Sequence, residues 1–196
     1  MTYVYTRMTS PVGTLKLVAS ERGLAAIVWA DEDPARVRLG PATEDRAHPL
    51  LREAQRQLAE YFRGERRTFA LQLDFVGTAF QKKVWRELLR IPYGQTQSYS
   101  AIAGRLGNAG ASRAVGAANG KNPIAIVAPC HRLIGASGAL RGYAGGLAAK
   151  RRLLELEGNG DALAAPPRRG PQALGASSAA GSDSVACRPP KRRSRR

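Results

Sequence analysis

The chain has 196 residues, of which 43% are hydrophobic, and a formal net charge of +16. This length allows one large domain or two small ones, and the basic excess favours a polyanionic partner, with nucleic acid as the first candidate. No apolar run reaches transmembrane length and no apolar block follows an N-terminal basic stretch. We therefore expect a protein that is soluble, not secreted and located in the cytoplasm, on the nucleoid if the source is bacterial.

The first 76 residues predict a small α/β domain. Alternating residues at 2–8 and 14–20, followed by an apolar run at 24–30, predict an antiparallel β-meander. Residues 31–47 are polar and contain proline, so they predict a loop. Pro49 suits the first turn of a helix that ends at Gly64 and whose apolar stripe contains Leu51, Ala54, Leu58, Tyr61 and Phe62. Residues 68–75 predict a further strand.

Residues 77–158 predict a second, mainly helical domain. Thr78 suits the N-cap of a helix with Phe80, Val84, Leu88 and Leu89 on one face. Two short helices, at 98–106 and 111–119, flank a Gly/Asn turn in the manner of a helix-turn-helix. A last helix spans 147–157 and ends at Gly158, a suitable C′ residue.

The final stretch, residues 159–196, is rich in Pro, Gly, Ala and Ser, and contains eight Lys/Arg against two acidic residues. This composition predicts a disordered basic tail. Its end, "PPKRRSRR", has two interpretations: an unstructured extension that raises non-specific DNA affinity, or a nuclear-import patch. Cys187 lies in this tail and has no assigned role.

The helix at 111–119 is unusually rich in small residues, Ala114 among them. Arg113, Asn119 and Lys121 are its only long polar side chains, which is few for reading base edges in the major groove. Such a helix suits close contact with the DNA backbone and minor groove, without sequence recognition. The alternative is a helix packed tightly against a neighbour.

Cys130 stands in "PCHR", residues 129–132, and could be an apolar filler, a metal ligand, half of a disulfide or a nucleophile. A complete structural zinc site is not expected, because the chain has only two cysteines and two histidines and one of the cysteines lies in the predicted tail. A disulfide with the tail is not expected either. Glu157 shares the apolar face of its helix, and a buried carboxylate needs a partner, for which His131 is the natural candidate. His131 could then activate the thiol through a water, with positive potential from Arg132. An inert cysteine beside a satisfied core histidine remains the alternative.

The motif and its surroundings closely resemble the O6-alkylguanine-DNA alkyltransferases. The resemblance rests on "PCHR" between "GKNPIAIVA" and "GYAGGLAAKRRLLELEG", and on "FQKKVWRELLRIPYGQTQSYSAIA" and "SRAVGAANGKNP". It covers residues 1–158 and is strongest from about residue 78. It implies an α+β fold in which a ribonuclease-H-like N-terminal sheet domain with a helix precedes a winged-helix-like C-terminal domain with a helix-turn-helix. The implied activity is direct-reversal DNA repair.

In that activity an alkyl group of O6-alkylguanine moves from a flipped nucleotide in duplex DNA to the protein's own cysteine. The sequence leaves open whether O4-alkylthymine is a second substrate. The resemblance implies a monomer that acts once, with no metal and no cofactor. Cys130 would accept the alkyl group, His131 would act as base through water, and Glu157 would orient His131. The resemblance also implies that Asn122 holds the turn that supports the site, and that Tyr99 gives a hydrogen bond or a proton to the departing guanine. Leu133, Tyr143 and Ala144 would line the pocket. Arg113 would fill the gap that the flipped nucleotide leaves in the base stack, and further DNA contacts would come from Ala114, Lys121 and Arg132.

Two other functions compete with this interpretation. A thiol hydrolase with a Cys-His-Glu triad would regenerate its thiol and release product beyond one equivalent. A non-catalytic DNA-binding protein or transcription regulator would keep the DNA-binding helices, but such relatives lack the cysteine or carry additional N-terminal domains.

Overall fold

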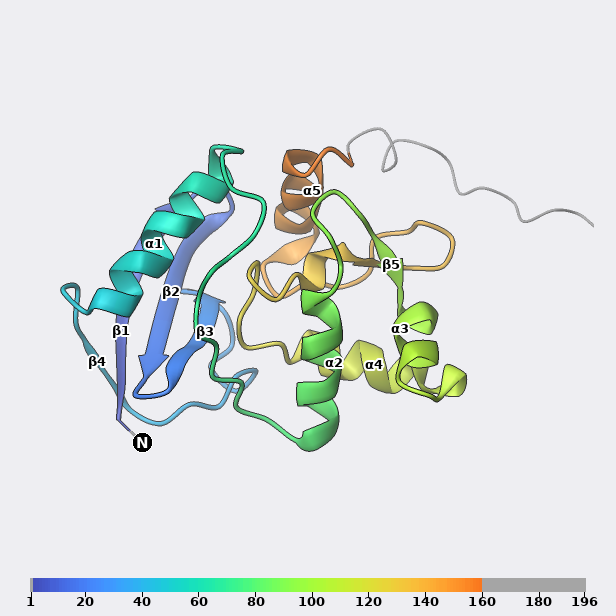
Figure 1. The fold of residues 1–196 in the computed structure, drawn as a ribbon, viewed down its shortest axis with the longest axis horizontal. Helices are drawn as coiled ribbons and strands as arrows, with labels where there is room; N and C mark the ends of the chain where they lie inside the picture. Colours follow the sequence, from blue (N-terminus) through green and yellow to red (C-terminus); the bar gives the residue numbers. More distant parts are fainter. Residues whose placement is uncertain (1, 160–196) are drawn as a thin grey trace, which may run out of the picture.

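The computed structural model describes residues 2–159, and nearly all of the predicted basic tail, Cys187 included, lies outside the described residues. An N-terminal sheet covered by one helix lies beside a group of C-terminal helices (Figure 1). The predicted α+β architecture is therefore confirmed. Among residues 2–159, no helix combines the length and the apolar character needed to cross a membrane.

The sheet begins with the predicted meander of β1 (Tyr3–Ser10), β2 (Gly13–Ser20) and β3 (Gly23–Trp29). These strands are antiparallel, and the full strand order is β3-β2-β1-β4. The prediction of a plain loop at 31–47 is wrong at β4 (Ala42–Glu44), which pairs in parallel with β1 from Tyr3 to Tyr5. The outer edge of β1 carries backbone groups that need partners, and three residues of the connecting segment supply them.

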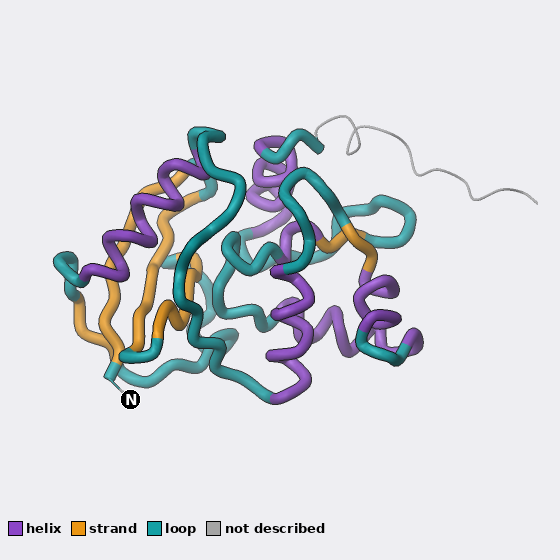
Figure 2. Tube along the Cα trace, viewed as in Figure 1, coloured by secondary structure: helices purple, strands orange, loops and turns teal. Residues whose placement is uncertain are grey.

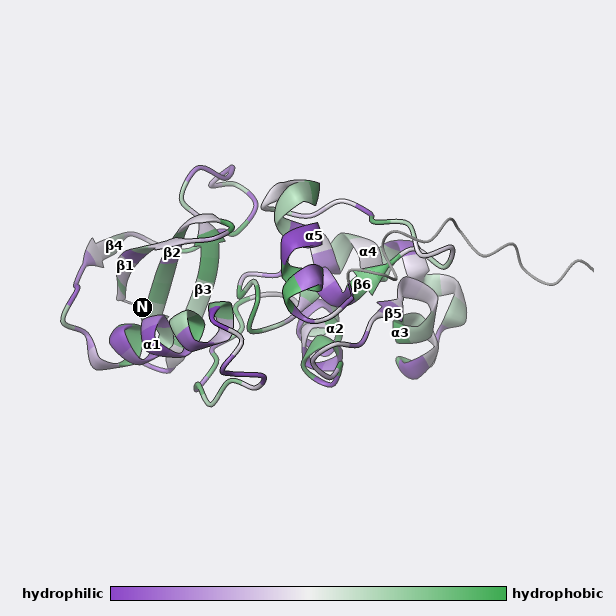
Figure 3. Ribbon diagram, turned by 90° about the horizontal axis from the view of Figure 1, so that it is seen from above, coloured by the Kyte–Doolittle hydropathy of each residue, from purple (hydrophilic) through white to green (hydrophobic). Residues whose placement is uncertain are grey.

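Helix α1 (Pro49–Phe62) covers one face of this sheet, with Pro49 in its first turn as predicted. Gly64, at φ 78°, takes the left-handed conformation that lets the chain leave the helix. Leu51, Leu58 and Tyr61 are fully buried in the cluster that contains the inward-facing side chains of β2 and β3. Figure 3 shows β2 and β3 as largely hydrophobic, whereas α1 has mixed hydropathy, as expected for a helix with one face in solvent.

The segment between α1 and α2 runs between the strands and the C-terminal helices (Figure 2). The predicted strand at 68–75 is wrong, because only Leu73 forms a bridge, with Leu24 of β3. The rest of the β3 edge is taken by the segment before Cys130. Ile27 N donates to Pro123 O at 2.9 Å, and Ala125 N donates to Ile27 O at 3.0 Å. The same sheet edge thus holds the interdomain segment and the segment that leads to Cys130.

Helix α2 (Ala79–Leu89) begins with a capping box in which Thr78 and Gln81 each satisfy the other's backbone N–H, which confirms Thr78 as the N-cap. Val84 and Leu88 are buried as predicted, but Phe80 is 38% and Leu89 is 43% exposed. Both lie near an end of the helix, and the buried contacts of α2 come from its central turns. The predicted four-residue stripe is therefore half correct.

The remaining C-terminal helices match the predictions to within one or two residues: they are α3 (Tyr99–Arg105), α4 (Ser112–Gly120) and α5 (Gly146–Leu156). The sequence did not predict the strands β5 (Gln97–Ser98) and β6 (Leu133–Ile134), or the 3₁₀ helices η1 (Ala109–Ala111) and η2 (Cys130–Arg132). β5 and β6 form a short parallel pair that ties the start of α3 to the chain just after Cys130. Gly158 follows α5 with φ 86°, as a C′ glycine should.

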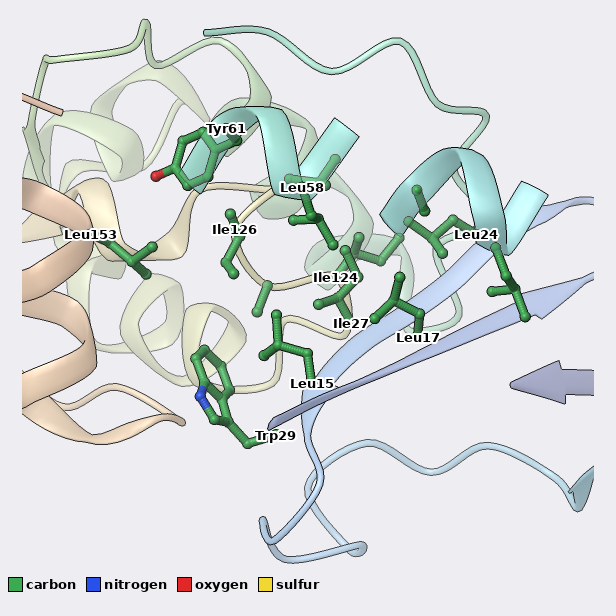
Figure 4. Close-up of a cluster of buried hydrophobic side chains, with 14 of the residues drawn as sticks. Leu15, Leu17, Leu24, Ile27, Trp29, Leu58, Tyr61, Ile124, Ile126 and Leu153 are labelled. Carbon is green, nitrogen blue, oxygen red and sulfur yellow. The ribbon is translucent and has the colours of Figure 1, made fainter. Parts of the chain in front are cut away.

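Two hydrophobic clusters meet at the segment that precedes Cys130. Residues 124–127 are buried with the side chains between α1 and the sheet, together with Leu153 of α5 (Figure 4). Cys130 and Leu133 instead belong to the cluster formed by α2, α3 and α4. The chain therefore passes from one cluster into the other within three residues, and the position of Cys130 depends on both halves.

Candidate active site

Cys130 follows a turn whose backbone is strained. Ile126 has φ 72°, a left-handed conformation that a β-branched residue adopts only at a cost of about 1–2 kcal/mol. Asn122 bonds this turn at both ends: its Nδ2 donates to Ala128 O at 2.8 Å, and its Oδ1 accepts from Ile124 N at 3.1 Å. These are the bonds expected of a residue that holds the turn, and they direct the chain toward Cys130.

His131 and Glu157 meet as the sequence predicted. His131 Nε2 lies 2.9 Å from Glu157 Oε1, and both side chains are fully buried. Glu157 also accepts from Arg132, with Nε at 2.8 Å from Oε2 and Nη2 at 2.9 Å from Oε1. Burial alone would raise the pKa of Glu157, but the hydrogen bonds from His131 and Arg132 outweigh it and lower that pKa to about 2. Glu157 is therefore a carboxylate at neutral pH.

Burial determines the charge of His131, and Glu157 determines which ring nitrogen carries its proton. Burial lowers the pKa of His131, although Glu157 opposes this effect, so the ring is neutral near pH 7. A neutral ring that meets a carboxylate through Nε2 carries its proton there, which leaves the lone pair on Nδ1. Nδ1 is buried, and no group within residues 2–159 bonds it. His131 thus presents a free basic nitrogen inside the protein.

The thiol of Cys130 needs such a base. Burial raises its pKa, and a hydrogen bond from Asn122 only partly offsets this effect. The resting sulfur is therefore protonated, and a nucleophilic thiolate requires that the proton be removed. Across the described residues, no three His, Cys, Asp or Glu side chains gather as metal ligands would.

The structure corrects the predicted role of Arg132. This side chain was expected to contact DNA, but the residue is only 6% exposed and forms an ion pair with Glu157. Its Nη1 also donates to Ile91 O at 2.5 Å. A buried carboxylate requires a compensating charge, and Arg132 supplies it in place of binding phosphate.

Three of the predicted site residues, Leu133, Tyr143 and Tyr99, belong to the cluster that contains Cys130 or pack against it. Leu133 is buried, and Tyr143 is half-buried with its ring 6.4 Å from that of His131. Tyr99, at the start of α3, packs against the same cluster; burial raises the pKa of its phenol, and a negative charge on Cys130 raises it further. Ala144 is exposed and, with Trp29 and other residues, lines a cleft of about 550 Å³ beside this region.

Helix α4 exposes the small face that the sequence predicted. Arg113, Ala114 and Lys121 are exposed, and so are Ala117 and Gly120 along the same side of the helix. Asn119, one of the three long polar side chains noted on this helix, is buried and does not belong to the exposed face. The small side chains along this exposed face allow close contact with a polyanion, and the face has a long cationic side chain at each end, Arg113 and Lys121.

Three residues near the site were missed from the sequence. Tyr61 of α1 donates to Glu157 Oε1 at 2.7 Å, across 96 positions of the chain. Lys150 is fully buried, and its Nζ donates to Leu133 O at 2.5 Å and to Arg141 O at 2.9 Å. Trp29 packs edge-to-face against Tyr143, with ring centroids 5.2 Å apart. Lys150 lies three residues before Leu153, on the apolar face of α5, so the pattern that identified Glu157 could have identified it too.

The geometry of the site indicates a class of protein. A buried cysteine with a neutral histidine base and a carboxylate lies behind a pair of short helices that expose a small-residue, basic face. Thiol chemistry directed at a nucleic acid is the function that this combination suits.

Comparison with known proteins specifies the family. Residues 3–75 match the ribonuclease-like domain of 6-O-methylguanine DNA methyltransferase, and residues 79–159 match the DNA binding domain of the same family. The chain is 51% identical over 150 residues to the methylated-DNA–protein-cysteine methyltransferase of Mycobacterium leprae, covering 76% of this chain and 89% of that protein. The chain belongs to the 6-O-methylguanine DNA methyltransferase family.

Solved structures agree with this assignment. The O6-methylguanine methyltransferase of Mycobacterium tuberculosis is similar at a TM-score of 0.72 and 47% identity, over 79% of this chain and 92% of that one. Its structure in complex with DNA is similar at a TM-score of 0.71 and 46% identity, over 80% and 92% of the two chains. The resemblance and the fold expected from the sequence are both confirmed.

Proposed function

We propose that this protein repairs DNA by transferring an alkyl group from O6-alkylguanine to Cys130, once per molecule. The observation that carries the proposal is the buried relay of Cys130, His131 and Glu157 behind the exposed face of α4, in a chain of this family. The acting species is a monomer, because one chain supplies every group that the reaction uses.

Binding begins with the exposed face of α4. Backbone contacts from this helix and Lys121 supply affinity that is independent of sequence and falls with salt. The reacting carbon is inaccessible inside the duplex, so the nucleotide must rotate out of the stack at a cost of a few kcal/mol. Arg113, exposed at the start of α4, occupies the space that the nucleotide leaves.

The chemical step is a displacement at the alkyl carbon. A water passes the thiol proton of Cys130 to Nδ1 of His131, and Glu157 stabilises the imidazolium that forms. The sulfur attacks the alkyl carbon, an S–C bond forms, and the C–O6 bond breaks with its electron pair moving onto the guanine. Tyr99 donates a hydrogen bond or a proton to the departing ring, and the backbone N–H of Ala144 donates to O6.

The product determines the stoichiometry. The thioether on Cys130 is a poor leaving group, so the protein cannot return to its starting state by hydrolysis. The reaction moves one alkyl group and one proton, and it needs no cofactor. O4-alkylthymine offers the same alkyl–oxygen bond on a flipped base, and we include it as a second substrate.

The test is a stoichiometric transfer assay. The protein is incubated with duplex DNA that contains O6-methylguanine, and mass spectrometry locates the added methyl group. We expect one methyl per chain, on the peptide that contains Cys130. Cys187→Ala is the matched control and should react normally, whereas Cys130→Ala should not react. Methyl loss from DNA by Cys130→Ala, or product released well beyond one equivalent as a thiol hydrolase would release it, contradicts the proposal.

A further inference from the structure

Tyr61 brings the N-terminal half of the protein into contact with the relay. It lies in the last turn of α1, is fully buried, and donates its hydroxyl to Glu157 Oε1 at 2.7 Å. Figure 4 shows its ring next to the cluster under α1, with the hydroxyl pointing away from Leu58 toward the side where α5 lies. Glu157 itself stands directly after α5, in the other half of the chain.

Tyr61 and His131 bond the same carboxylate oxygen. Glu157 Oε1 accepts from Tyr61 Oη at 2.7 Å, from His131 Nε2 at 2.9 Å and from Arg132 Nη2 at 2.9 Å. A donor that shares an oxygen withdraws charge from the other bonds that this oxygen makes. The hydroxyl of Tyr61 therefore weakens the pull of Glu157 on the His131 proton.

Tyr61 remains a donor at every working pH. Burial raises the pKa of its phenol, and the negative charge of Glu157 raises it further. The phenol cannot ionise beside a buried carboxylate without placing two negative charges together. Its bond to Oε1 is thus a fixed feature of the relay.

We propose that Tyr61 is a positioning residue for alkyl transfer, which holds Glu157 in place and keeps His131 neutral enough to act as a base. The proposal rests on the proposed function. It assigns the N-terminal domain a direct part in the chemistry, although that domain contributes none of the residues placed in the relay from the sequence.

Removing the hydroxyl of Tyr61 shifts the pKa of His131 in a predictable direction. Without the bond from Tyr61, Glu157 concentrates more charge on His131, and the pKa of His131 rises. The other charged or titratable groups around His131 are Arg132 and Cys130 in η2, Lys150 on α5 and Tyr143 in the pocket segment. None of them is altered by the change, so the acidic limb of the pH–rate profile should move to higher pH.

The experiment measures single-turnover methyl transfer by Tyr61→Phe between pH 5 and pH 9. We expect the acidic limb to move up by about half a unit to one unit, so that the rate on the steep part of that limb falls by up to about threefold to tenfold at a fixed pH, with little change at pH 8.5. Tyr93→Phe is the matched control, because its hydroxyl donates to Leu156 O at 2.8 Å instead of to a carboxylate. A Tyr61→Phe profile that superimposes on that of the unchanged protein, or an equal shift in Tyr93→Phe, overturns the proposal.

A second comparison tests whether Tyr61 acts through Glu157. In a Glu157→Gln background, Tyr61→Phe should change the transfer rate by less than about twofold, because the carboxylate is already absent. If Tyr61→Phe lowers the transfer rate by the same factor with Glu157 and with Gln at position 157, the proposal is contradicted. NMR titration of His131 gives a readout that needs no substrate: its pKa should rise in Tyr61→Phe. If the unchanged protein transfers no methyl group, the proposed function fails, and this titration still decides the role of Tyr61.

Discussion

Replacing Glu157 with Gln tests whether the buried carboxylate is charged in the folded protein. Hydrogen bonds from His131 and Arg132, acting against burial, bring the pKa of Glu157 to about 2, compared with 4.5 for an ordinary glutamate. A difference of this size corresponds to about 3 kcal/mol of folding free energy. Because the folded-state pKa is the lower one, this stability is fully present above about pH 4.5 and is lost as the pH falls toward about 2.

Glu157→Gln should therefore be much less stable than the unchanged protein at pH 7 and should differ from it less at low pH. At pH 7 the loss is about 3–5 kcal/mol, since Arg132 keeps its buried charge without a carboxylate partner. Below pH 4.5 the difference in unfolding free energy between the unchanged protein and Glu157→Gln should narrow by up to about 3 kcal/mol, because Glu157 takes up a proton. The buried, neutral His131 adds a slope of the same sign that begins at higher pH, and both proteins contain this histidine.

The assay is urea unfolding at several pH values between 7 and 3, followed by the fluorescence of the two buried tryptophans. Glu65→Gln is the matched control, because Glu65 pairs with Arg63 on the surface, where both side chains are 56% exposed. That control should show a far smaller change. A gap between Glu157→Gln and the unchanged protein that stays constant from pH 5 to pH 3 would refute a charged Glu157.

Three further changes probe the pocket and the DNA face. Lys150→Met removes the donor to the carbonyl oxygens of Leu133 and Arg141, so limited proteolysis within residues 134–145 should accelerate and methyl transfer should slow. Gly145→Ala places a Cβ 2.3 Å from Cε2 of Trp29, so thermal unfolding should show a loss of about 1–3 kcal/mol, whereas Gly142→Ala, which meets open space, should not. Lys121→Gln should weaken DNA binding equally for all sequences and reduce the slope of log affinity against log salt by about one.

Local patterns predicted the regular elements well, because each depends on neighbours in the sequence. The apolar stripe of α1, the capping box at Thr78 and the glycine after α5 all act within one or two turns of a helix. The failed strand at 68–75 shows the limit of such patterns. Its alternation suits a strand, yet β3 has only one free edge, and residues 123–125 occupy part of it. The sequence of a segment does not show that a distant segment competes with it for the same strand edge.

The active site also contains features that the sequence could predict and features that only the fold reveals. The partnership of His131 with Glu157 could be inferred because a carboxylate on an apolar helix face needs a partner, and this chain has only two histidines. Arg132 was assigned to DNA because an arginine beside a nucleophile carries the right charge for either role. Only the fold shows that it satisfies Glu157. Tyr61 is an ordinary apolar-face tyrosine in sequence, and its hydroxyl gains a role only because the fold brings Glu157, the residue after α5, next to the last turn of α1.

The burial of this cluster explains why the two halves of the protein depend on each other. Glu157 and Arg132 are removed from water, which costs several kcal/mol for each ion and is offset only when every bond of the pair is made. One of those bonds comes from α1, and the segment before Cys130 is held by the edge of β3 and by the cluster under α1. Separated from the N-terminal domain, residues 77–158 would keep the cysteine, the histidine and the DNA-binding helices. They would lose both the burial that keeps His131 neutral and the support that holds the strained turn at Ile126, so the thiol would lie beside a protonated and misplaced base.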